Sequence, residues 1–170
     1  MQQRRRSRIG ALSIVVFGLT LGFLGPQVTN ARPLTDCDHF TGAYLTTLTD
    51  ADGNFASRSI LTLSVDGTLL SSNSSQGGLK GVFNPFTTAQ GTWQCTGSQT
   101  FAATVLDFTL EGSAGPDLGI GRLDYKAMVD RETQAVEGTV ELRFFPLKGN
   151  PLSDKTTVSG AFSFGGQRIP

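Results

Sequence analysis

The feature that most constrains the fold is strict two-residue alternation between positions 100 and 145. In residues 120–130 and 136–145, apolar side chains occupy every second position and charged side chains lie between them. In residues 100–111, Leu106, Phe108 and Leu110 share one face, which we expect to point inward, and Asp107, Thr109 and Glu111 share the other. Alternation with period two is typical of strands that bury one face. The sequence therefore predicts three consecutive half-buried strands, whose outer faces can pair opposite charges across strands.

The first 31 residues have the organisation of a secretory signal peptide. Four arginines between positions 4 and 8 precede an uncharged apolar run, residues 9–24, and the small-residue site Thr29-Asn30-Ala31 suits cleavage after Ala31. A membrane anchor is the alternative, since about 16 apolar residues fall just short of the ~20 that span a bilayer. We expect a signal peptide at residues 1–31, followed by a secreted or periplasmic chain.

The expected mature chain, residues 32–170, has the size and charge of one ordinary domain. Removing residues 1–31 leaves ten basic and 14 acidic residues, a net charge of −4. The sequence offers no basic patch for nucleic acid and no basic amphipathic helix for a membrane surface. We therefore expect one β-barrel domain at 32–170, no nucleic-acid partner and no membrane contact after signal cleavage. The oligomeric state is not indicated.

Cys37 and Cys95 are the two cysteines of the chain. In an exported protein two cysteines most simply pair with each other, and two separate buried thiols are the alternative. A disulfide closing a loop of this length stabilises by about 4 kcal/mol in the chain-entropy model. We expect a Cys37–Cys95 disulfide that joins the leading segment to the fourth strand.

Eight strands in all are predicted, joined by short turns and with no helical period between them. Their expected ranges are 40–48, 55–65, 68–75, 87–96, 100–111, 120–130, 136–145 and 155–169. Regular short strands favour an antiparallel meander, and eight such strands close into a barrel without exposed edges. A β-sandwich is the alternative, although it needs crossings that these short turns do not supply. The glycine-rich residues 76–86, with four large apolar side chains, are expected to fold over one end.

The strand layout resembles a known type of barrel. Phe40-Thr-Gly42-Ala-Tyr44 opens the first strand as in calycins and lipocalins, whose first strand carries Gly-x-Trp; here Tyr44 stands in place of the tryptophan. Gly91-Thr-Trp93, residues 103–108, Val136-Glu-Gly-Thr139 and residues 160–165 are similar to small bacterial and fungal proteins likened to the allene oxide cyclase barrel. The resemblance covers nearly the whole mature chain. It implies a ligand-sized interior and, in some relatives, a cyclisation reaction there.

Aromatic residues on the expected inner faces predict a binding surface for a small apolar molecule. The candidate ligand-binding residues are Tyr44, Trp93, Phe108, Tyr125, Phe144 and Phe162. Gly42, Gly91, Gly138 and Gly160 fall on the same faces, where a glycine leaves space that a side chain otherwise fills. The alternative is a packed barrel in which these glycines only relieve curvature.

Few residues of the chain suggest catalysis. Asp36, Asp38 and His39 form the one cluster of metal-ligand or acid–base types, and a solvated loop is the favoured interpretation. Asp107 is expected on the wet face of its strand with Glu111. The Tyr44 and Tyr125 hydroxyls inside an apolar cavity can orient a carbonyl. No nucleophile with a base partner is visible, and no metal or cofactor is expected.

We therefore expect a barrel that binds a small hydrophobic ligand in its interior. A cyclase or isomerase that shapes a flexible apolar substrate is the first alternative, and a structural or interaction module with a filled core is the second. A polar group that projects into the interior favours the enzyme over the binding protein.

Overall fold

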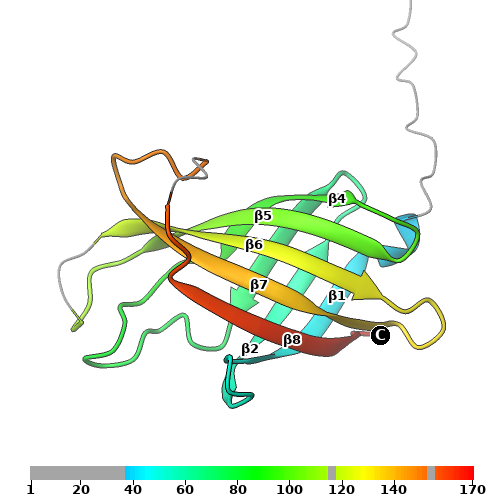
Figure 1. Cartoon of the computed structure of the whole chain (residues 1–170), viewed down its shortest axis with the longest axis horizontal. Helices are drawn as coiled ribbons and strands as arrows, with labels where there is room; N and C mark the ends of the chain where they lie inside the picture. Colours follow the sequence, from blue (N-terminus) through cyan, green and yellow to red (C-terminus); the bar gives the residue numbers. More distant parts are fainter. Residues whose placement is uncertain (1–36, 115–117, 153–155) are drawn as a thin grey trace, which may run out of the picture. The chain divides into compact units, whose positions relative to one another are not determined.

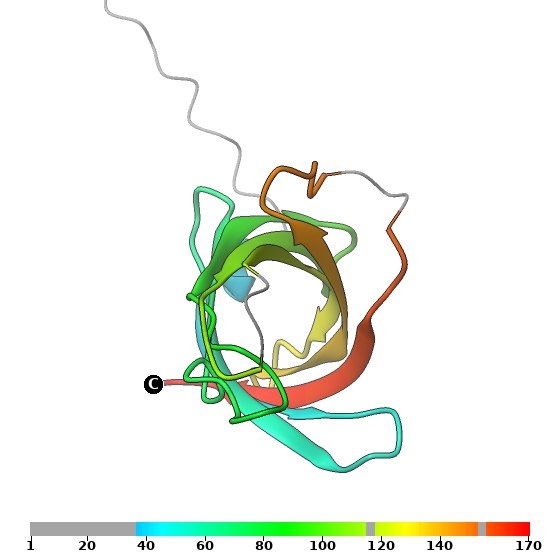
Figure 2. The same cartoon turned by 90° about the vertical axis from the view of Figure 1, so that its left-hand side faces the viewer.

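Eight antiparallel strands follow one another around a closed barrel in chain order (Figures 1 and 2). The computed structural model describes residues 37–114, 118–152 and 156–170, so the expected signal peptide lies outside the described residues. The strands are β1 Gly42–Thr49, β2 Phe55–Leu63, β3 Thr68–Asn73, β4 Ala89–Cys95, β5 Thr100–Thr109, β6 Gly119–Val129, β7 Ala135–Pro146 and β8 Gly160–Arg168. The predicted meander barrel is confirmed, and the β-sandwich alternative is wrong.

Pairing of the first strand with the last closes the sheet. Residues 44–49 of β1 pair antiparallel with residues 163–168 of β8, so the sheet has no free edge along this seam. The longest ladder runs between β6 and β7, where Gly119 faces Pro146 at one end and Val129 faces Val136 at the other. Closure satisfies backbone groups that an open sheet leaves exposed to pairing with other chains.

The strand bounds differ from the predicted ones mainly at the ends of the chain. A 3-10 helix, η1 (Asp38–Phe40), replaces the expected start of the first strand, and β1 begins at Gly42. The last strand begins at Gly160 instead of residue 155. In the described part of the chain, no helix has the length and apolar character needed to cross a bilayer.

The end of the barrel next to η1 is filled with aromatic side chains. Phe40 is fully buried, with its ring centroid 6.1 Å from that of Phe101 and 6.4 Å from that of Trp93. Aliphatic side chains from the other strands complete this core, among them Leu61, Leu63, Leu69, Val105, Val129, Val136 and Val140. Burial of each such side chain contributes about 1.5–3 kcal/mol. The η1 segment therefore serves as a plug.

A disulfide between Cys37 and Cys95 anchors this plug. It joins the residue before η1 to the last residue of β4, with 5.9 Å between the two Cα atoms. Cys37 itself is fully buried. The predicted pairing of the two cysteines, and its connection to the fourth strand, are confirmed.

Several inward glycines mark places where neighbouring strands come too close for a side chain. A Cβ at Gly91 would overlap the Thr104 carbonyl oxygen, and one at Gly138 would overlap the Lys126 carbonyl oxygen. The interpretation that these two glycines leave open interior space is therefore wrong. They relieve curvature in a strongly coiled sheet, which was the alternative.

Opposite charges pair on the outer face of β6 and β7, as predicted. Asp124 accepts hydrogen bonds from Arg122 Nε at 3.0 Å and from an Arg143 terminal nitrogen at 2.5 Å, and Arg143 also binds Glu141 at 2.6 Å. The register places like charges directly opposite, Arg122 to Arg143 and Asp124 to Glu141, so the pairs form along the strands and diagonally. Arg122 further donates to the Pro151 carbonyl at 3.3 Å.

Two neighbouring glycines of β8 test the curvature argument. A Cβ at Gly166 would overlap the Leu45 carbonyl oxygen of β1, whereas a Cβ at Gly165 lies 4.0 Å from its nearest contact, the Val136 carbonyl oxygen. Gly166→Ala should lower the free energy of unfolding by about 2 kcal/mol or more, because backbone must move. Gly165→Ala should change it by less than about 1 kcal/mol. Urea unfolding measures both, and equal effects would contradict the argument.

Removing the disulfide should lower the melting temperature. Because the bridge closes a loop with a sequence separation of 58 residues, its loss is expected to cost about 4 kcal/mol in the chain-entropy model, or roughly 10 °C for a domain of this size. Calorimetry of the Cys37→Ser/Cys95→Ser double variant, compared with the oxidised protein, gives the number. An unchanged melt would mean that the bridge does not hold the η1 plug.

Candidate functional site

Strand β5 turns Asp107 into the barrel, opposite to the predicted orientation. Phe101, Val105 and Asp107 are all at most 6% exposed, whereas Phe108 is 55% exposed. The expected inner face was therefore shifted by one residue. A one-residue shift exchanges the two faces of a strand.

The cause of this error lies on the outside of the barrel. Phe108 is paired with Ile120 of β6, and Ile120 is paired with Phe145 of β7. These three residues form an apolar row across the outer face. Ile120 and Phe145 are buried although they point away from the interior. At this end of β5 the outer face is thus apolar and the inner face carries Asp107, so the alternation in the sequence indicates the opposite orientation.

Four of the six aromatic residues predicted to line the interior do face it. Tyr44 and Tyr125 are buried, and Trp93 and Phe162 are partly buried against the core. Phe144 shares the inward alternation of β7 but lies near the end of the strand, where it is 51% exposed. Phe108 points outward, as described above.

Two of these residues use their polar groups within the η1 end of the core. The Tyr44 hydroxyl donates to the Phe40 carbonyl at 2.9 Å, and the Trp93 indole nitrogen donates to the Ser64 carbonyl at 2.9 Å. Burial raises the pKa of Tyr44, and the positive charge of Arg168 partly opposes that shift. These two side chains stabilise the packed end and offer no free donor to a ligand.

Asp107, Tyr125 and Ser71, which we call the Asp107 cluster, bring polar groups together inside the barrel. The Tyr125 hydroxyl lies 3.1 Å from the Ser71 hydroxyl, so this side chain reaches across the interior from β6 to β3. Ser71 is opposite Ala89 of β4, and the β4–β5 register, continued by one residue, places Ala89 beside Asp107. The negative charge of Asp107 also acts on Tyr125.

The carboxylate of Asp107 rests directly on Gly121 of β6. A Cβ at position 121 would overlap the carboxylate oxygens, so only glycine leaves room for them in this position. Burial raises the pKa of Asp107 to about 6, and a hydrogen bond from the Gly121 amide opposes the rise. A carboxyl group that titrates near neutrality can accept or deliver a proton, which is the property of a general acid or base.

Tyr125 remains protonated at physiological pH and serves as a hydrogen-bonding group. Its pKa is raised to about 12, mainly by burial and also by the charge of Asp107, while the hydrogen bond to Ser71 opposes the rise. Its ring packs edge-on against Phe164 at a centroid distance of 5.8 Å. The hydroxyl is thus held in place by contacts on two sides.

Buried serines on β2 and an asparagine on β3 add polar groups to the interior. The Asn73 amide nitrogen donates to the Ser57 and Ser59 hydroxyls at 3.0 Å each, and its oxygen accepts from the Ser75 hydroxyl at 2.6 Å. Ser57 and Ser59 are both buried. This network is internally satisfied, so its role is to fix the β2–β3 wall.

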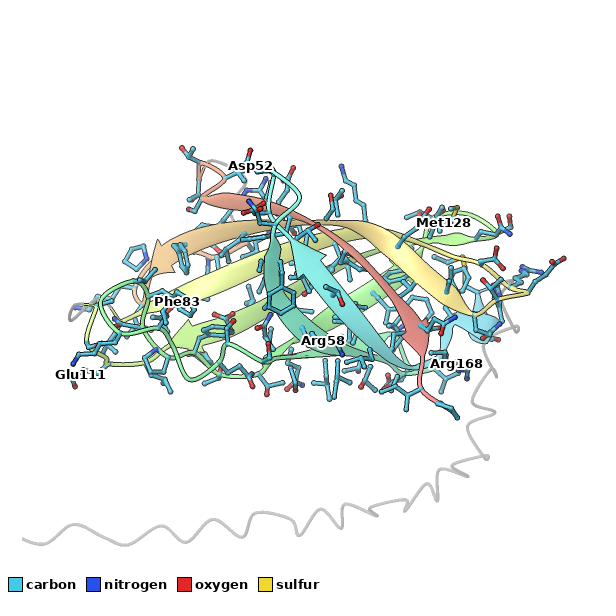
Figure 3. The ribbon with its side chains drawn as sticks, turned by 90° about the horizontal axis from the view of Figure 1, so that it is seen from below. Asp52, Arg58, Phe83, Glu111, Met128 and Arg168 are labelled. Carbon is cyan, nitrogen blue, oxygen red and sulfur yellow. A yellow bond between two sulfur atoms is a disulfide. The ribbon has the colours of Figure 1, made fainter. Side chains whose placement is uncertain are left out.

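The end of the barrel opposite η1 carries the long loops (Figures 1 and 2). Most of the exposed large apolar residues also belong to this end. The β3–β4 loop is joined to the β5–β6 loop, because the Leu110 amide donates to the Pro85 carbonyl at 2.8 Å and the Ala114 amide to Asn84 Oδ1 at 3.0 Å. Figure 3 shows Phe83 and Glu111 at this end and Arg168 at the other. Exposed apolar residues of the loops here are Leu79, Val82, Phe83, Leu110, Leu118, Leu147, Leu152 and Val158.

The histidine cluster predicted as a solvated loop lies at the η1 end. Asp36 is outside the described residues, and His39 accepts a hydrogen bond from Arg131 Nε at 3.1 Å. The His39 ring also packs against Phe40, with 4.1 Å between centroids. Within the described ranges, no group of three or more metal-binding side chains comes together.

A shallow groove of about 440 Å³ lies on β6, β7 and β8, at the short-turn side of the sheet. Lys126, Met128, Glu137 and Thr139 line it. The groove is open to solvent and gathers no acid–base pair, so we place the candidate site at the Asp107 cluster.

No family model, curated protein or solved structure matches this chain. The structure shows an eight-stranded antiparallel meander barrel.

The pH dependence of stability should reveal the buried Asp107 carboxyl. Its pKa is about 6 in the folded protein against 3.8 in the unfolded chain. The folded state therefore binds the proton more tightly, and this group makes the protein less stable as pH rises from 4 to 6. The full loss is at most about 3 kcal/mol. Asp50, Asp66 and Asp130, whose pKa values are lowered, act in the opposite direction at low pH.

Asp107→Asn isolates that contribution. As pH rises from 4 to 7, the unfolding free energy of the variant should increase by about 1–3 kcal/mol relative to that of the original protein. Urea unfolding across this range measures it, and carboxyl NMR should give a pKa near 6 for Asp107 directly. A difference that stays constant with pH would contradict a buried, ionising Asp107.

Proposed function

We propose that the mature chain is a secreted or periplasmic barrel that binds a small hydrophobic molecule in the half of its interior next to the long loops. The observation that carries this proposal is the contrast between the two ends. The η1 end is packed with Phe40, Phe101 and Trp93, whereas the opposite end presents exposed apolar side chains on several loops. Exposed apolar groups that gather at one place commonly mark a binding region.

Side-chain sizes inside the barrel support the same location. Around the Asp107 carboxylate the inward residues are small, namely Ser71, Ala89 and Gly121. Toward η1 they give way to large aliphatic and aromatic residues. Ligand sites in proteins are mostly apolar with a few convergent polar groups, and the Asp107 cluster supplies such groups.

The resemblance to lipocalin-type barrels agrees with this proposal. In such barrels eight strands enclose an interior wide enough for side chains or for one small ligand. The joined β3–β4 and β5–β6 loops, with Phe83 and Leu110 exposed, would cover a guest at the long-loop end. We assign these loops the role of a lid.

Filling the interior should abolish ligand binding. Ala89→Leu places a larger side chain inside the barrel beside Asp107, and Gln90→Leu places the same side chain on the outer face of the same strand. The uncharged fluorescent probe N-phenyl-1-naphthylamine should bind the original protein and Gln90→Leu, but not Ala89→Leu. Melting curves of both variants verify folding. Equal binding by all three proteins would place the probe outside the barrel and contradict the proposal.

A second candidate function is a cyclase or isomerase, which the inward position of Asp107 favours. A carboxylate with a pKa near 6 can remove a proton from carbon next to a carbonyl, while the Tyr125 hydroxyl donates a hydrogen bond to that carbonyl. The proton returned to another carbon completes an isomerisation without a cofactor.

Solvent exchange separates this enzyme from a binding protein. A ligand copurified from the native host and identified by native mass spectrometry is incubated with the protein in D₂O. An enzyme should introduce deuterium at carbon, and Asp107→Asn should slow that exchange by at least about a hundredfold. A ligand that binds and never gains deuterium rules out the proton-transfer mechanism.

A further inference from the structure

Among the described residues, no basic side chain forms an ion pair with the Asp107 carboxylate inside the barrel. The ion pairs found in the described part of the chain lie on the outer face, at Asp124 and its arginine partners, and none involves Asp107. This carboxylate is 6% exposed and held by the Gly121 amide. A buried carboxylate without a cation is costly, and an ion that pairs with it removes most of that cost.

The neighbouring strands supply no such cation. β3 and β4 contain no charged residue, and the lysine and arginines of β6 and β7 alternate outward, in register with the exposed face. Arg58 of β2 is exposed between the buried Ser57 and Ser59, so it points outward. Arg168 of β8 lies at the end of the barrel away from Phe83 and Glu111, as Figure 3 shows. In the described strands, the other titratable side chains on the inward alternation are Tyr125, Tyr44 and Arg168, and the positively charged one, Arg168, lies at the opposite end from Asp107.

We infer that Asp107 binds the protonated nitrogen of an amphipathic amine whose apolar portion lies along the interior near the long loops. This inference rests on the proposed ligand-binding function and names its ligand class. An ammonium group beside the carboxylate forms a charge-assisted hydrogen bond, stronger than one between neutral groups. The edge-packed rings of Tyr125 and Phe164 lie on the same inner wall and add apolar and cation–π contact.

The same geometry rejects other head groups. A fatty-acid carboxylate would meet the Asp107 charge at close range, and the inward cation of the described strands, Arg168, lies at the opposite end of the barrel, too far away to offset that repulsion. A neutral alcohol can hydrogen-bond to the cluster but gains no ion pair. Selectivity should therefore follow the order amine, alcohol, acid when the apolar portion is held constant.

Three eight-carbon probes test this order by isothermal titration at pH 7.5: n-octylamine, octan-1-ol and octanoate. The intact protein should bind octylamine at least tenfold more tightly than octanol, and octanoate more weakly than either. Asp107→Asn should remove the preference for the amine while leaving octanol affinity within twofold. Glu137→Gln, which removes a carboxylate from the exposed outer face, should keep the preference unchanged.

The pH dependence provides a second measurement that needs no variant. Octylamine stays protonated below about pH 10, like a lysine side chain, whereas Asp107 becomes neutral as pH falls through about 6. The amine preference of the intact protein should thus fall about tenfold from pH 7.5 to pH 5. Octanol affinity should stay constant over this range.

The outcomes separate the amine assignment from the broader proposal. Equal binding of octanol and octylamine, or an equal loss in Glu137→Gln and Asp107→Asn, overturns the assignment and leaves hydrophobic-ligand binding in place. Binding of none of the three probes up to their solubility limits overturns both.

Discussion

Closure of the sheet between β1 and β8 is the constraint on which the rest of the structure depends. The seam joins residues 44–49 to residues 163–168, and it requires strands that coil strongly and approach one another closely. Gly166 lies within this seam, and Gly91 and Gly138 occupy comparable points elsewhere, where a Cβ would overlap the neighbouring backbone. Closure therefore accounts for both the absence of an open edge along the seam and the glycines that once suggested empty space.

The closed sheet has two unlike ends. At one end, the disulfide holds η1 so that Phe40 packs among Phe101 and Trp93, and the hydroxyl of Tyr44 bonds to the backbone of the plug. This end supplies stability. At the other end small residues surround a buried carboxylate that lowers stability near neutral pH. Proteins commonly retain such unfavourable groups at sites where they bind or react.

Much of the fold was predictable because β6 and β7 alternate apolar and charged residues without ambiguity. The charged positions of these two strands also predicted the ion pairs on the outer face, and the presence of two cysteines predicted the disulfide. The orientation of β5 was not predictable, since its outward residues Leu106 and Phe108 are apolar and an aspartate is normally assigned to the wet face. On the outer face Phe108 pairs with Ile120, which is itself apolar and buried. Ser71 was also not predicted as a site residue, because serine occurs at both inner and outer positions of a strand. Tyr125 was identified, but its hydrogen-bond partner depends on which strands lie across the barrel.

The bond between Tyr125 and Ser71 spans the interior, and Phe40 fills the space at the far end. If a ligand binds as proposed, the packed η1 end leaves the long-loop end as its entrance. Under that proposal the ligand enters and leaves past the loops around Phe83 and Leu110, so these loops would set the rates of both binding and release. Substitutions in those loops would then alter the rates of binding and release without altering ligand preference, which the proposal assigns to Asp107.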